Sequence, residues 1–433
     1  MPLSMMTVRL KIIFLKSVWQ LRKLFFLSVS AFYLVFVPVV VSAQENSISP
    51  YSRLFKLRGD LHIHSKTASF DSICLSPGCR SFSASEQFTE AYQAGLDFAA
   101  VTEHLRHPLP PYKKASEQQW HKVIASAQRY RPEDMITFYG YEWGSSMQSC
   151  YWLDADKKDY GHRVVILPPG ESRYCLADQC RTPDELARFM AKVGAVGITA
   201  HPWRTLIVDP KFNEQKRDSL PAFLSRNYFD YRGNGQDDVW IGAEVGPDFY
   251  SISGQWALSP ICEQPKLRLD TQTVTVPEWE DALANGKWLA AISSSDRHFD
   301  FIPFGLRTTV VFAKERSHQG IMEALRARRT LAAYMMPFNV ELYSGSAMFG
   351  DTVDKSKMLS IKLDADSGSV EEMQLNRPGE TIRSWKGDNA IGLFRIPAQD
   401  IPSGPVWVHI IGTEVDDNLH LQRTTITSPI WLK

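Results

Sequence analysis

The chain contains a His-x-His pair, His62 and His64, with aliphatic residues on either side of His62. Alternate residues of a β-strand point to the same face, so the two imidazoles would lie side by side while Leu61 and Ile63 face the packing behind them. Two neutral imidazoles at this spacing suit zinc, manganese or iron better than calcium or magnesium, which prefer oxygen ligands. A lone pair also fits a metal-free strand, so the interpretation depends on further ligands.

Further histidines and carboxylates stand beside short apolar runs elsewhere in the chain. Those that follow a run are Glu103, His104, Glu142, His201, Asp296 and His298, and His162 stands just before one. In a barrel of parallel strands the reactive groups collect at the C-terminal ends of the strands. We therefore expect these side chains to meet and to hold more than one metal ion.

Two other carboxylates are expected to support this cluster. Glu244 closes the run 239–243 and reaches the same edge by the same rule, as a substrate-binding group or as a partner of a ligand. Asp60 precedes the His-x-His pair and can hold an imidazole in one tautomer.

The elements that must position these residues alternate between helix and strand. Helices are expected over 84–95, 120–131 and 183–193, and strands over 98–102, 135–139, 163–167, 195–199, 239–245 and 288–293. Alternation of this kind predicts parallel β/α units, and seven or eight of them favour a barrel over an open sheet. The predicted fold class is α/β.

After Arg329 the helical pattern gives way to short alternating runs at 340–343, 360–363, 406–411 and 424–432. Turn residues separate these runs, which is typical of a small antiparallel β-sandwich. We therefore expect a barrel domain over 51–336 and a sandwich domain over 337–433.

The N-terminus has the features of an export signal, with basic residues before the apolar run 24–41 and Val41-Ser42-Ala43 as a cleavage site. A cleaved signal over 1–43 predicts a periplasmic or secreted protein without stable membrane insertion. The run is almost long enough to span a bilayer, so an uncleaved membrane anchor is the alternative.

The six cysteines fit an oxidising compartment, where an even number is more often disulfide than metal thiolate. Cys74 with Cys79, and Cys175 with Cys180, are each close enough in sequence to form a local bridge. Cys150 and Cys262 pair or stay reduced.

The charge balance restricts the partners. Lys plus Arg equals Asp plus Glu at 48 each, so the net charge is zero. A neutral chain has no positive field with which to release counterions from phosphates, which argues against nucleic-acid binding. A small-molecule substrate is expected, and the sequence does not predict the oligomeric state.

Five short motifs, taken in order, resemble those of the polymerase-and-histidinol-phosphatase (PHP) superfamily of metal-dependent hydrolases. They are His62-x-His64, Thr102-Glu103-His104, Glu142 after a strand, Ala200-His201-Pro202 and Ser295-Asp296-x-His298. The resemblance covers roughly residues 57–329. Gly140 to Trp143 and Gly161 to Arg163 are most similar to exported bacterial members, whose relatives include carbamate-insecticide hydrolases.

The resemblance implies a distorted (β/α)7 barrel whose mouth holds two or three divalent ions, zinc, manganese or iron. It implies one ion bound by His62, His64, Glu142 and Asp296, a second that Glu142 bridges and His162 and His201 hold, and a third near His104 and His298. Asp71 is the nearest candidate for a ligand that usually follows the first pair. Glu103 stands where Asp is usual, and either supports a ligand or is structural.

The same resemblance makes Glu142, Asp296 and His201 the catalytic residues. Two cations about 3.5–4 Å apart turn a bridging water into hydroxide near neutral pH and neutralise charge on a phosphoryl or acyl oxygen. Arg163, Arg204 and Arg297 stand beside these residues and are expected to pair with a phosphate or carboxylate, although a structural role fits each equally well.

We therefore predict an exported metal-dependent hydrolase that acts on phosphoesters. Carbamates or carboxyl esters are the alternative substrates for the same site, and a deep apolar pocket beside Trp143 and Trp203 would favour them. A non-catalytic metal- or ligand-binding protein is the remaining alternative.

Overall fold

The structure is a computed structural model that describes residues 49–69, 72, 80–105, 115–130, 135–144, 160–202, 229, 239–245, 277–300, 303–364, 369–416 and 419–433. These residues belong to one compact unit, Ser49–Lys433. The predicted signal segment 1–43 lies outside the described residues, as do Asp71, Trp203, Arg204 and the cysteines Cys74, Cys79, Cys150 and Cys262.

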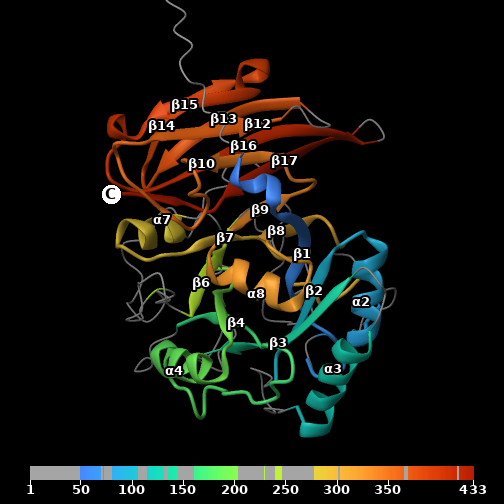
Figure 1. The fold of residues 1–433 in the computed structure, drawn as a ribbon. Coiled ribbons are helices and arrows are strands. Elements are labelled where there is room, and N and C mark those ends of the chain that lie inside the picture. Colours follow the sequence, from blue (N-terminus) through green and yellow to red (C-terminus); the bar gives the residue numbers. More distant parts are fainter. Residues whose placement is uncertain are drawn as a thin grey trace, which may run out of the picture. The chain divides into compact units, whose positions relative to one another are not determined.

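Helices are interspersed among the strands up to α8, and strands predominate after it (Figure 1). The helices are α2 (Ala84–Gln93), α3 (Glu117–Arg129), α4 (Pro183–Val193), α7 (Pro277–Ala284) and α8 (His318–Arg326), with short 3-10 turns η1 (Pro50–Arg53), η6 (Gly387–Ala390) and η7 (Ala398–Asp400). The strands of the first part are β1 (Phe55–Ile63), β2 (Phe98–Glu103), β3 (Ile136–Gly144), β4 (His162–Ile166), β5 (Val196–Thr199), β6 (Trp240–Glu244), β7 (Ala290–Ile292), β8 (Arg307–Ala313) and β9 (Thr330–Tyr334). Those of the second part are β10 (Val340–Tyr343), β11 (Thr352–Val353), β12 (Met358–Leu363), β13 (Ser369–Arg377), β14 (Glu380–Lys386), β15 (Gly392–Pro397), β16 (Gly404–Asp416), β17 (Leu419–Thr427) and β18 (Ile430–Leu432).

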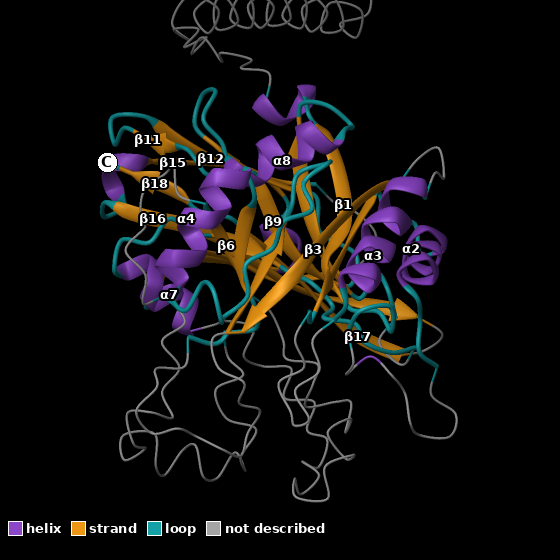
Figure 2. Cartoon of the chain, turned by 90° about the horizontal axis from the view of Figure 1, so that it is seen from below, coloured by secondary structure: helices purple, strands orange, loops and turns teal. Residues whose placement is uncertain are grey.

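The helix boundaries follow from local capping. Ser83 accepts a hydrogen bond from the backbone N–H of Glu86, whose side chain reaches back to Ser83 in a capping box that begins α2. The Thr182 side chain accepts from the backbone N–H of Glu185 and caps α4, with Pro183 in the first turn. Gly194 ends α4 in the left-handed conformation, with φ 71°. Helices α2 and α3 lie side by side, next to β2 and β3 (Figure 2).

The strands up to β9 join most of the later ones in one large sheet, so the fold is mixed α/β. Strands β1, β2 and β3 are parallel, and so are β5, β6 and β7. Between them β4 runs antiparallel to both of its neighbours. The expectation that every unit is parallel is therefore wrong at β4.

Backbone pairing does not confirm a (β/α)7 barrel, because the order of the described strands from β8 through β1 to β7 stays open. Side-chain hydrogen bonds join β7 and the residues just after it to β8 and β9. The Thr309 hydroxyl donates to the carbonyl of Ser293 at 2.8 Å and accepts from its N–H at 3.0 Å, and Thr330 donates to the Ala291 carbonyl at 2.9 Å. An isolated parallel bridge also joins Ile63 to Arg297.

The strands after β9 are mostly antiparallel, as the alternating runs predict. Strands β10, β12 and β15 form a separate three-stranded sheet, and β13, β16 and β17 continue the large one. Buried side chains from the two sheets, among them Leu342, Ile361, Leu375 and Ile410, belong to one apolar core. Strand β9 pairs with both β8 and β17, so the large sheet runs without a break across the predicted domain boundary at 336.

The described residues contain short helices and one of the two predicted local disulfides. Within the described part of the chain, every helix is too short or too polar to cross a membrane. The predicted bridge between Cys175 and Cys180 is present, with an S–S distance of 2.01 Å. A disulfide is typical of proteins that mature in an oxidising compartment.

Candidate metal centre

Ends of neighbouring strands bring the sequence-predicted ligands to one place. His62 and His64 lie on and just after β1, His104 follows β2, Glu142 lies on β3, His162 begins β4, His201 follows β5, and Asp296 and His298 follow β7. The Ile63 to Arg297 bridge places the segment after β7 directly beside β1. The outer strands of the set therefore meet at the His-x-His pair.

Glu142 is the centre of the group, because five imidazoles surround its buried carboxylate. Its Oε2 lies 2.8 Å from His104 Nε2, 3.1 Å from His64 Nε2 and 3.2 Å from His62 Nε2, and its Oε1 lies 2.7 Å from His162 Nδ1 and 3.0 Å from His201 Nε2. One oxygen thus faces the β1 and β2 histidines, and the other faces those of β4 and β5.

Asp296 supplies the second carboxylate on the β1 side. Its Oδ1 lies 3.0 Å from His64 Nε2 and 3.3 Å from His62 Nε2. His298 turns back toward it, with Nδ1 2.9 Å from the Asp296 carbonyl oxygen. The ring of His298 stacks on that of His64 at 4.2 Å between centroids.

The way these atoms meet fits divalent metal ions. Glu142 Oε2 and His162 Nδ1 are buried and have no hydrogen-bond partner among the described residues. Glu142 Oε2 nevertheless lies 2.8 Å from His104 Nε2, and His162 Nδ1 lies 2.7 Å from Glu142 Oε1. Atoms that converge at short distance without hydrogen-bond geometry are arranged as ligands of a common cation. Three sets have ligand atoms within 4.8 Å of one another: His62, His64, Glu142 and Asp296; His104, Glu142 and His162; and His64, His104 and His298.

The close packing of imidazoles and carboxylates shifts the pKa values of His62 and Glu142 in the metal-free protein. Burial would lower the pKa of His62, but the carboxylates of Asp296, Glu142 and Glu244 outweigh it and raise that pKa well above its ordinary value. Burial opposes ionisation of Glu142, yet the imidazoles of His104, His162 and His62 hold its pKa well below the usual range. Glu142 is therefore a carboxylate that needs cations around it.

The direction of β4 explains how His162 reaches the centre. A residue at the start of a parallel strand would lie at the opposite edge of the sheet from Glu142. Because β4 is antiparallel to β3, His162 pairs with Gly144 at the end of β3, two residues beyond Glu142. The strand that departs from the predicted pattern is the one whose first residue is a candidate ligand.

Two of the candidate ligands have strained backbone. His201 has φ 28° and Asp296 has φ 51°, in the left-handed region that residues with a Cβ atom rarely adopt. Both residues are buried, with 2 % of their surface exposed. Strain of this kind persists only where the surrounding structure enforces it, and it gathers at functional sites.

Of the two supporting carboxylates, Glu244 contacts a candidate ligand side chain and Asp60 contacts backbone. Asp60 accepts hydrogen bonds from the backbone N–H groups of His62 at 3.1 Å and Ser295 at 3.2 Å, and not from an imidazole of the described residues. Glu244 lies 2.9 Å from His62 Nδ1 and accepts from the backbone N–H of His201 at 2.7 Å. Its position at the end of β6 was the signal in the sequence for this placement.

The arginines proposed for substrate are engaged with the protein itself. Arg163 is buried, donates to the His162 carbonyl at 2.7 Å and lies over the Trp240 ring. Arg297 is 3 % exposed, donates to the Phe299 carbonyl at 3.1 Å and lies against two phenylalanine rings. A substrate role for these two, and for Arg204 outside the described residues, stays a prediction.

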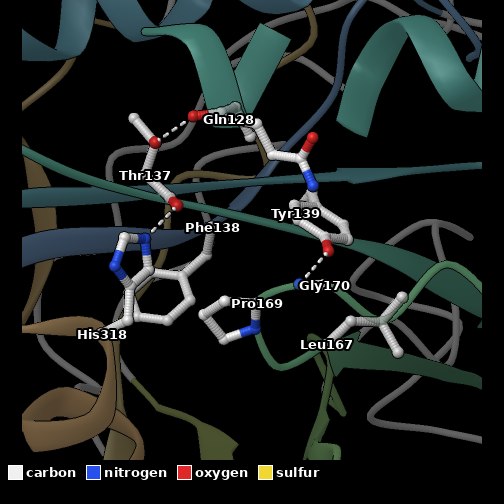
Figure 3. A pocket seen from close by; sticks show the side chains of 9 residues that line it. Gln128, Thr137, Phe138, Tyr139, Leu167, Pro169, Gly170 and His318 are labelled. Atoms are coloured by element: carbon white, nitrogen blue, oxygen red, sulfur yellow. Dashed lines mark hydrogen bonds between the residues drawn. The ribbon is translucent and has the colours of Figure 1, made fainter. Parts of the chain in front are cut away.

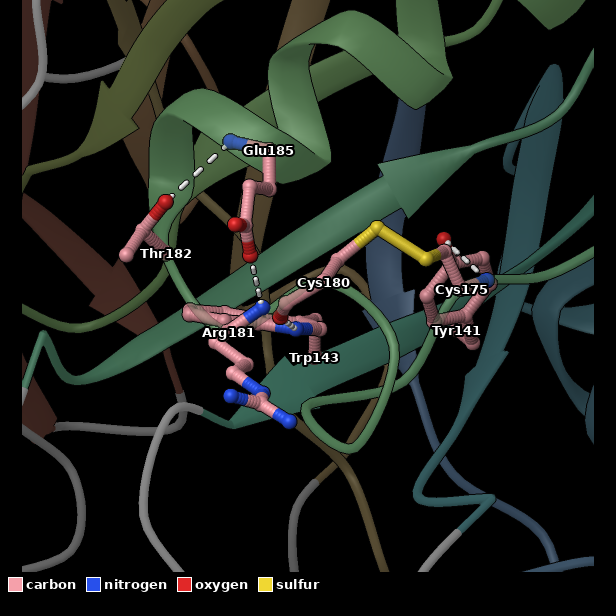
Figure 4. Close-up of a disulfide and its surroundings, with 7 residues drawn as sticks. All are labelled: Tyr141, Trp143, Cys175, Cys180, Arg181, Thr182 and Glu185. Atoms are coloured by element: carbon pink, nitrogen blue, oxygen red, sulfur yellow. Dashed lines mark hydrogen bonds between the residues drawn. A yellow bond between two sulfur atoms is a disulfide. The ribbon is translucent and has the colours of Figure 1, made fainter.

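A disulfide loop braces the back of the strand that carries Glu142 (Figure 4). Tyr141 and Trp143 alternate with Glu142 and point to the other face of β3. The Tyr141 hydroxyl accepts from the backbone N–H of Cys175 at 3.1 Å, and the Trp143 indole donates to the Cys180 carbonyl at 2.9 Å. Trp143 is fully buried there, so it does not line a pocket at the cluster.

A pocket of about 110 Å³ lies near the opposite end of β3 (Figure 3). Thr137, Phe138 and Tyr139 line it together with Pro169 and His318. The His318 imidazole contacts the Thr137 carbonyl at 2.9 Å. The pocket contains none of the candidate ligands and is separate from the cluster.

Comparisons with known proteins give little further identification. No protein-family model matches the chain, and no curated protein sequence matches it. Among solved structures, a two-domain protein from Bacteroides vulgatus that contains a predicted PHP-like metal-dependent phosphoesterase is similar at 19% identity, over 86% of this chain and 95% of that one, with a TM-score of 0.38. A likeness of this degree carries no argument about activity, which depends on the residues of the cluster.

Proposed function

We propose that this protein is a metal-dependent hydrolase of the PHP type that cleaves phosphoesters. The observation that supports this most is the position of Glu142, whose two carboxylate oxygens face separate sets of imidazoles at 2.7–3.2 Å. A carboxylate placed in this way can keep two cations close together and offset their mutual repulsion.

The side chains divide naturally between the cations. His62, His64, Glu142 and Asp296 would hold one ion, Glu142 with His162 and His201 a second, and His104 and His298 would help to hold a third. When bound, such ions supply Lewis acidity and a water-derived nucleophile near neutral pH. The chain supplies a mostly buried wall of imidazoles, and burial strengthens the charge interactions within it.

Phosphoesters are the proposed substrates because the PHP superfamily, which the motifs resemble, mostly acts on them. The carbamate and carboxyl-ester alternative has no support in the described residues, since Trp143 packs behind β3 and does not form an apolar wall. We further propose an exported protein, periplasmic or secreted, that acts on a small molecule and binds no nucleic acid.

The test is an assay of the mature chain after removal of its metals and reconstitution with zinc, manganese or iron(II). We expect metal-dependent hydrolysis within a panel of phosphomonoesters and phosphodiesters, with aryl esters and carbamates as comparison. Glu341→Gln, in β10 and outside the cluster, serves as a control. Hydrolysis of carbamates or aryl esters alone would show that phosphoesters are not the substrates. Full metal content without any turnover would indicate a binding protein.

A further inference from the structure

The two histidines of the His-x-His pair face the cluster through Nε2 and leave Nδ1 to another partner. His62 Nδ1 lies 2.9 Å from Glu244 Oε1, and His64 Nδ1 lies 3.2 Å from Ser69 Oγ. A neutral imidazole carries one proton, so the nitrogen that donates leaves the lone pair to the other. These partners therefore decide whether Nε2 is able to bind a cation.

Glu244 can only accept from His62. Its second oxygen, Oε2, already accepts from the backbone N–H of His201 at 2.7 Å, and its side chain is almost fully buried. A carboxylate has acceptors on both sides and no proton to give. When His62 is neutral, as it must be to bind a cation, its one proton is therefore on Nδ1, and the Nε2 lone pair faces Glu142 and Asp296.

Ser69, which donates to Glu103, fixes the tautomer of His64 in a similar way. The single hydroxyl proton of Ser69 is donated to Glu103 Oε2, and Ser69 Oγ itself accepts from the backbone N–H of His104 at 2.8 Å. Toward His64 this hydroxyl can only accept. Glu103 is held in turn by the backbone N–H of Ser65 at 3.0 Å and by the Ser65 hydroxyl.

We propose that Glu244 and Glu103 are positioning residues that fix the tautomers of the His-x-His pair, Glu244 directly and Glu103 through Ser69. Both carboxylates are buried, at 2 % and 0 % exposure. The Glu103 carboxylate contacts both Ser65 and Ser69. This inference rests on the metal site of the proposed function and not on the reaction performed there.

Glu244→Gln is the informative variant, because it keeps the shape and loses one acceptor. If the carboxamide oxygen accepts from the His201 N–H, its amine faces His62 Nδ1 and forces the imidazole proton onto Nε2. The opposite orientation places the amine against the His201 N–H, donor against donor. We expect zinc affinity to fall about 10- to 100-fold, the range for loss of a group that orients a metal ligand.

Glu103→Gln is the comparison variant, since it removes the same charge but keeps an oxygen that can accept from Ser69 and from the Ser65 N–H. Its amine faces the Ser65 hydroxyl, which can accept. We expect a smaller loss of zinc affinity than in Glu244→Gln, and Glu341→Gln, in β10 and outside the cluster, should keep the affinity of the parent. Ser69→Ala removes the acceptor for His64 Nδ1 and should weaken zinc binding by about tenfold.

The affinities are measured by chelator competition, and the tautomers by ¹H–¹⁵N spectra of the histidine rings in the zinc-loaded parent protein. We expect protonated Nδ1 in both His62 and His64. A proton on Nε2 of either ring, or equal losses of affinity in Glu244→Gln and Glu103→Gln, would overturn the inference. The parent spectra decide the matter even if a variant fails to fold. Zinc binding with the expected tautomers but no hydrolysis would refute the proposed function alone.

Discussion

Glu142 Oε1 and His201 Nε2 lie 3.0 Å apart although 59 positions separate the two residues in the chain. The carboxylate comes from β3 and the imidazole from the second residue after β5, with antiparallel β4 between them. Contacts that span three strands exist only when the sheet is formed. We therefore expect metal binding and folding of this part of the chain to be coupled.

Replacing Glu142 should disable two metal positions together, because its oxygens face separate sets of histidines. In Glu142→Gln we expect the bound metal to fall by two equivalents and turnover to fall by about 100-fold or more, beyond the usual loss for an orienting residue. Metal analysis combined with turnover measures both. Near-normal metal content and rate would mean that the carboxylate is structural.

His298→Ala should behave differently from Glu142→Gln. His298 belongs to the set with His64 and His104 and lies outside the two that contain Glu142. Its loss should remove at most one equivalent of metal and leave measurable hydrolysis. Complete loss of metal in this variant would contradict the division of ligands proposed here.

Metal should stabilise the folded protein in a concentration-dependent way. An ion that binds only the folded state contributes about 2.7 kcal/mol when it is present at a hundred times its Kd. Thermal unfolding of the metal-free protein should therefore move to higher temperature as zinc or manganese is added. Magnesium is the control, because it prefers oxygen ligands and should have little effect. Equal stabilisation by magnesium would argue against a histidine-rich site.

Acid should destabilise the C-terminal strands through His409. Burial lowers the pKa of this histidine on β16 to about 4, whereas an unfolded histidine has a pKa of about 6.5. Between these values the unfolded chain binds more protons, so this contribution to stability is complete above about pH 6.5 and is lost as the pH falls toward 4. The full difference is about 3 kcal/mol.

His409→Gln tests this dependence, since glutamine can still donate to the Thr424 hydroxyl that His409 Nε2 contacts at 2.9 Å. Urea unfolding between pH 4.5 and 7.5 should show a shallower loss of stability in the variant than in the parent. Parallel curves for the two proteins would show that His409 does not titrate in this window.

The Cys175–Cys180 bridge should stabilise the fold by about 2 kcal/mol, the chain-entropy value for so short a loop. The double Cys→Ser variant should show this loss in urea unfolding, and non-reducing mass mapping of the parent should find the bridge. The same mapping tests the predicted Cys74–Cys79 bridge. Free thiols at all four positions would count against export.

The sequence predicted most elements between α2 and β9 because capping residues and apolar runs are local signals. The Thr182 cap and Pro183 placed α4 at its observed bounds, 183–193. The direction of β4 was not predictable, since the segment before it, 145–159, carries no periodic pattern and strand direction depends on which neighbours pair. His162 was nevertheless recognised as a candidate ligand by its residue type.

The candidate site was predictable to the level of which histidines and carboxylates gather, but less so in their supporting contacts. Asp60 and Glu244 both stand next to predicted strand ends, and only the three-dimensional register decides which one faces an imidazole. The link from Glu103 through Ser69 to His64 was missed altogether. A serine between two apolar runs is ordinary in sequence and acquires meaning only through its neighbours.

The left-handed backbone at His201 and Asp296 has a consequence for how this protein would respond to selection. Each such residue costs about 1–3 kcal/mol in folding free energy, and glycine at either place would relieve it. A library screened for heat resistance alone should therefore enrich glycine at 201 and glycine or asparagine at 296. A library screened for metal retention should reject those same changes. Folding stability and metal retention thus favour different residues at these two positions. Thermostabilising designs of this fold should therefore leave both unaltered.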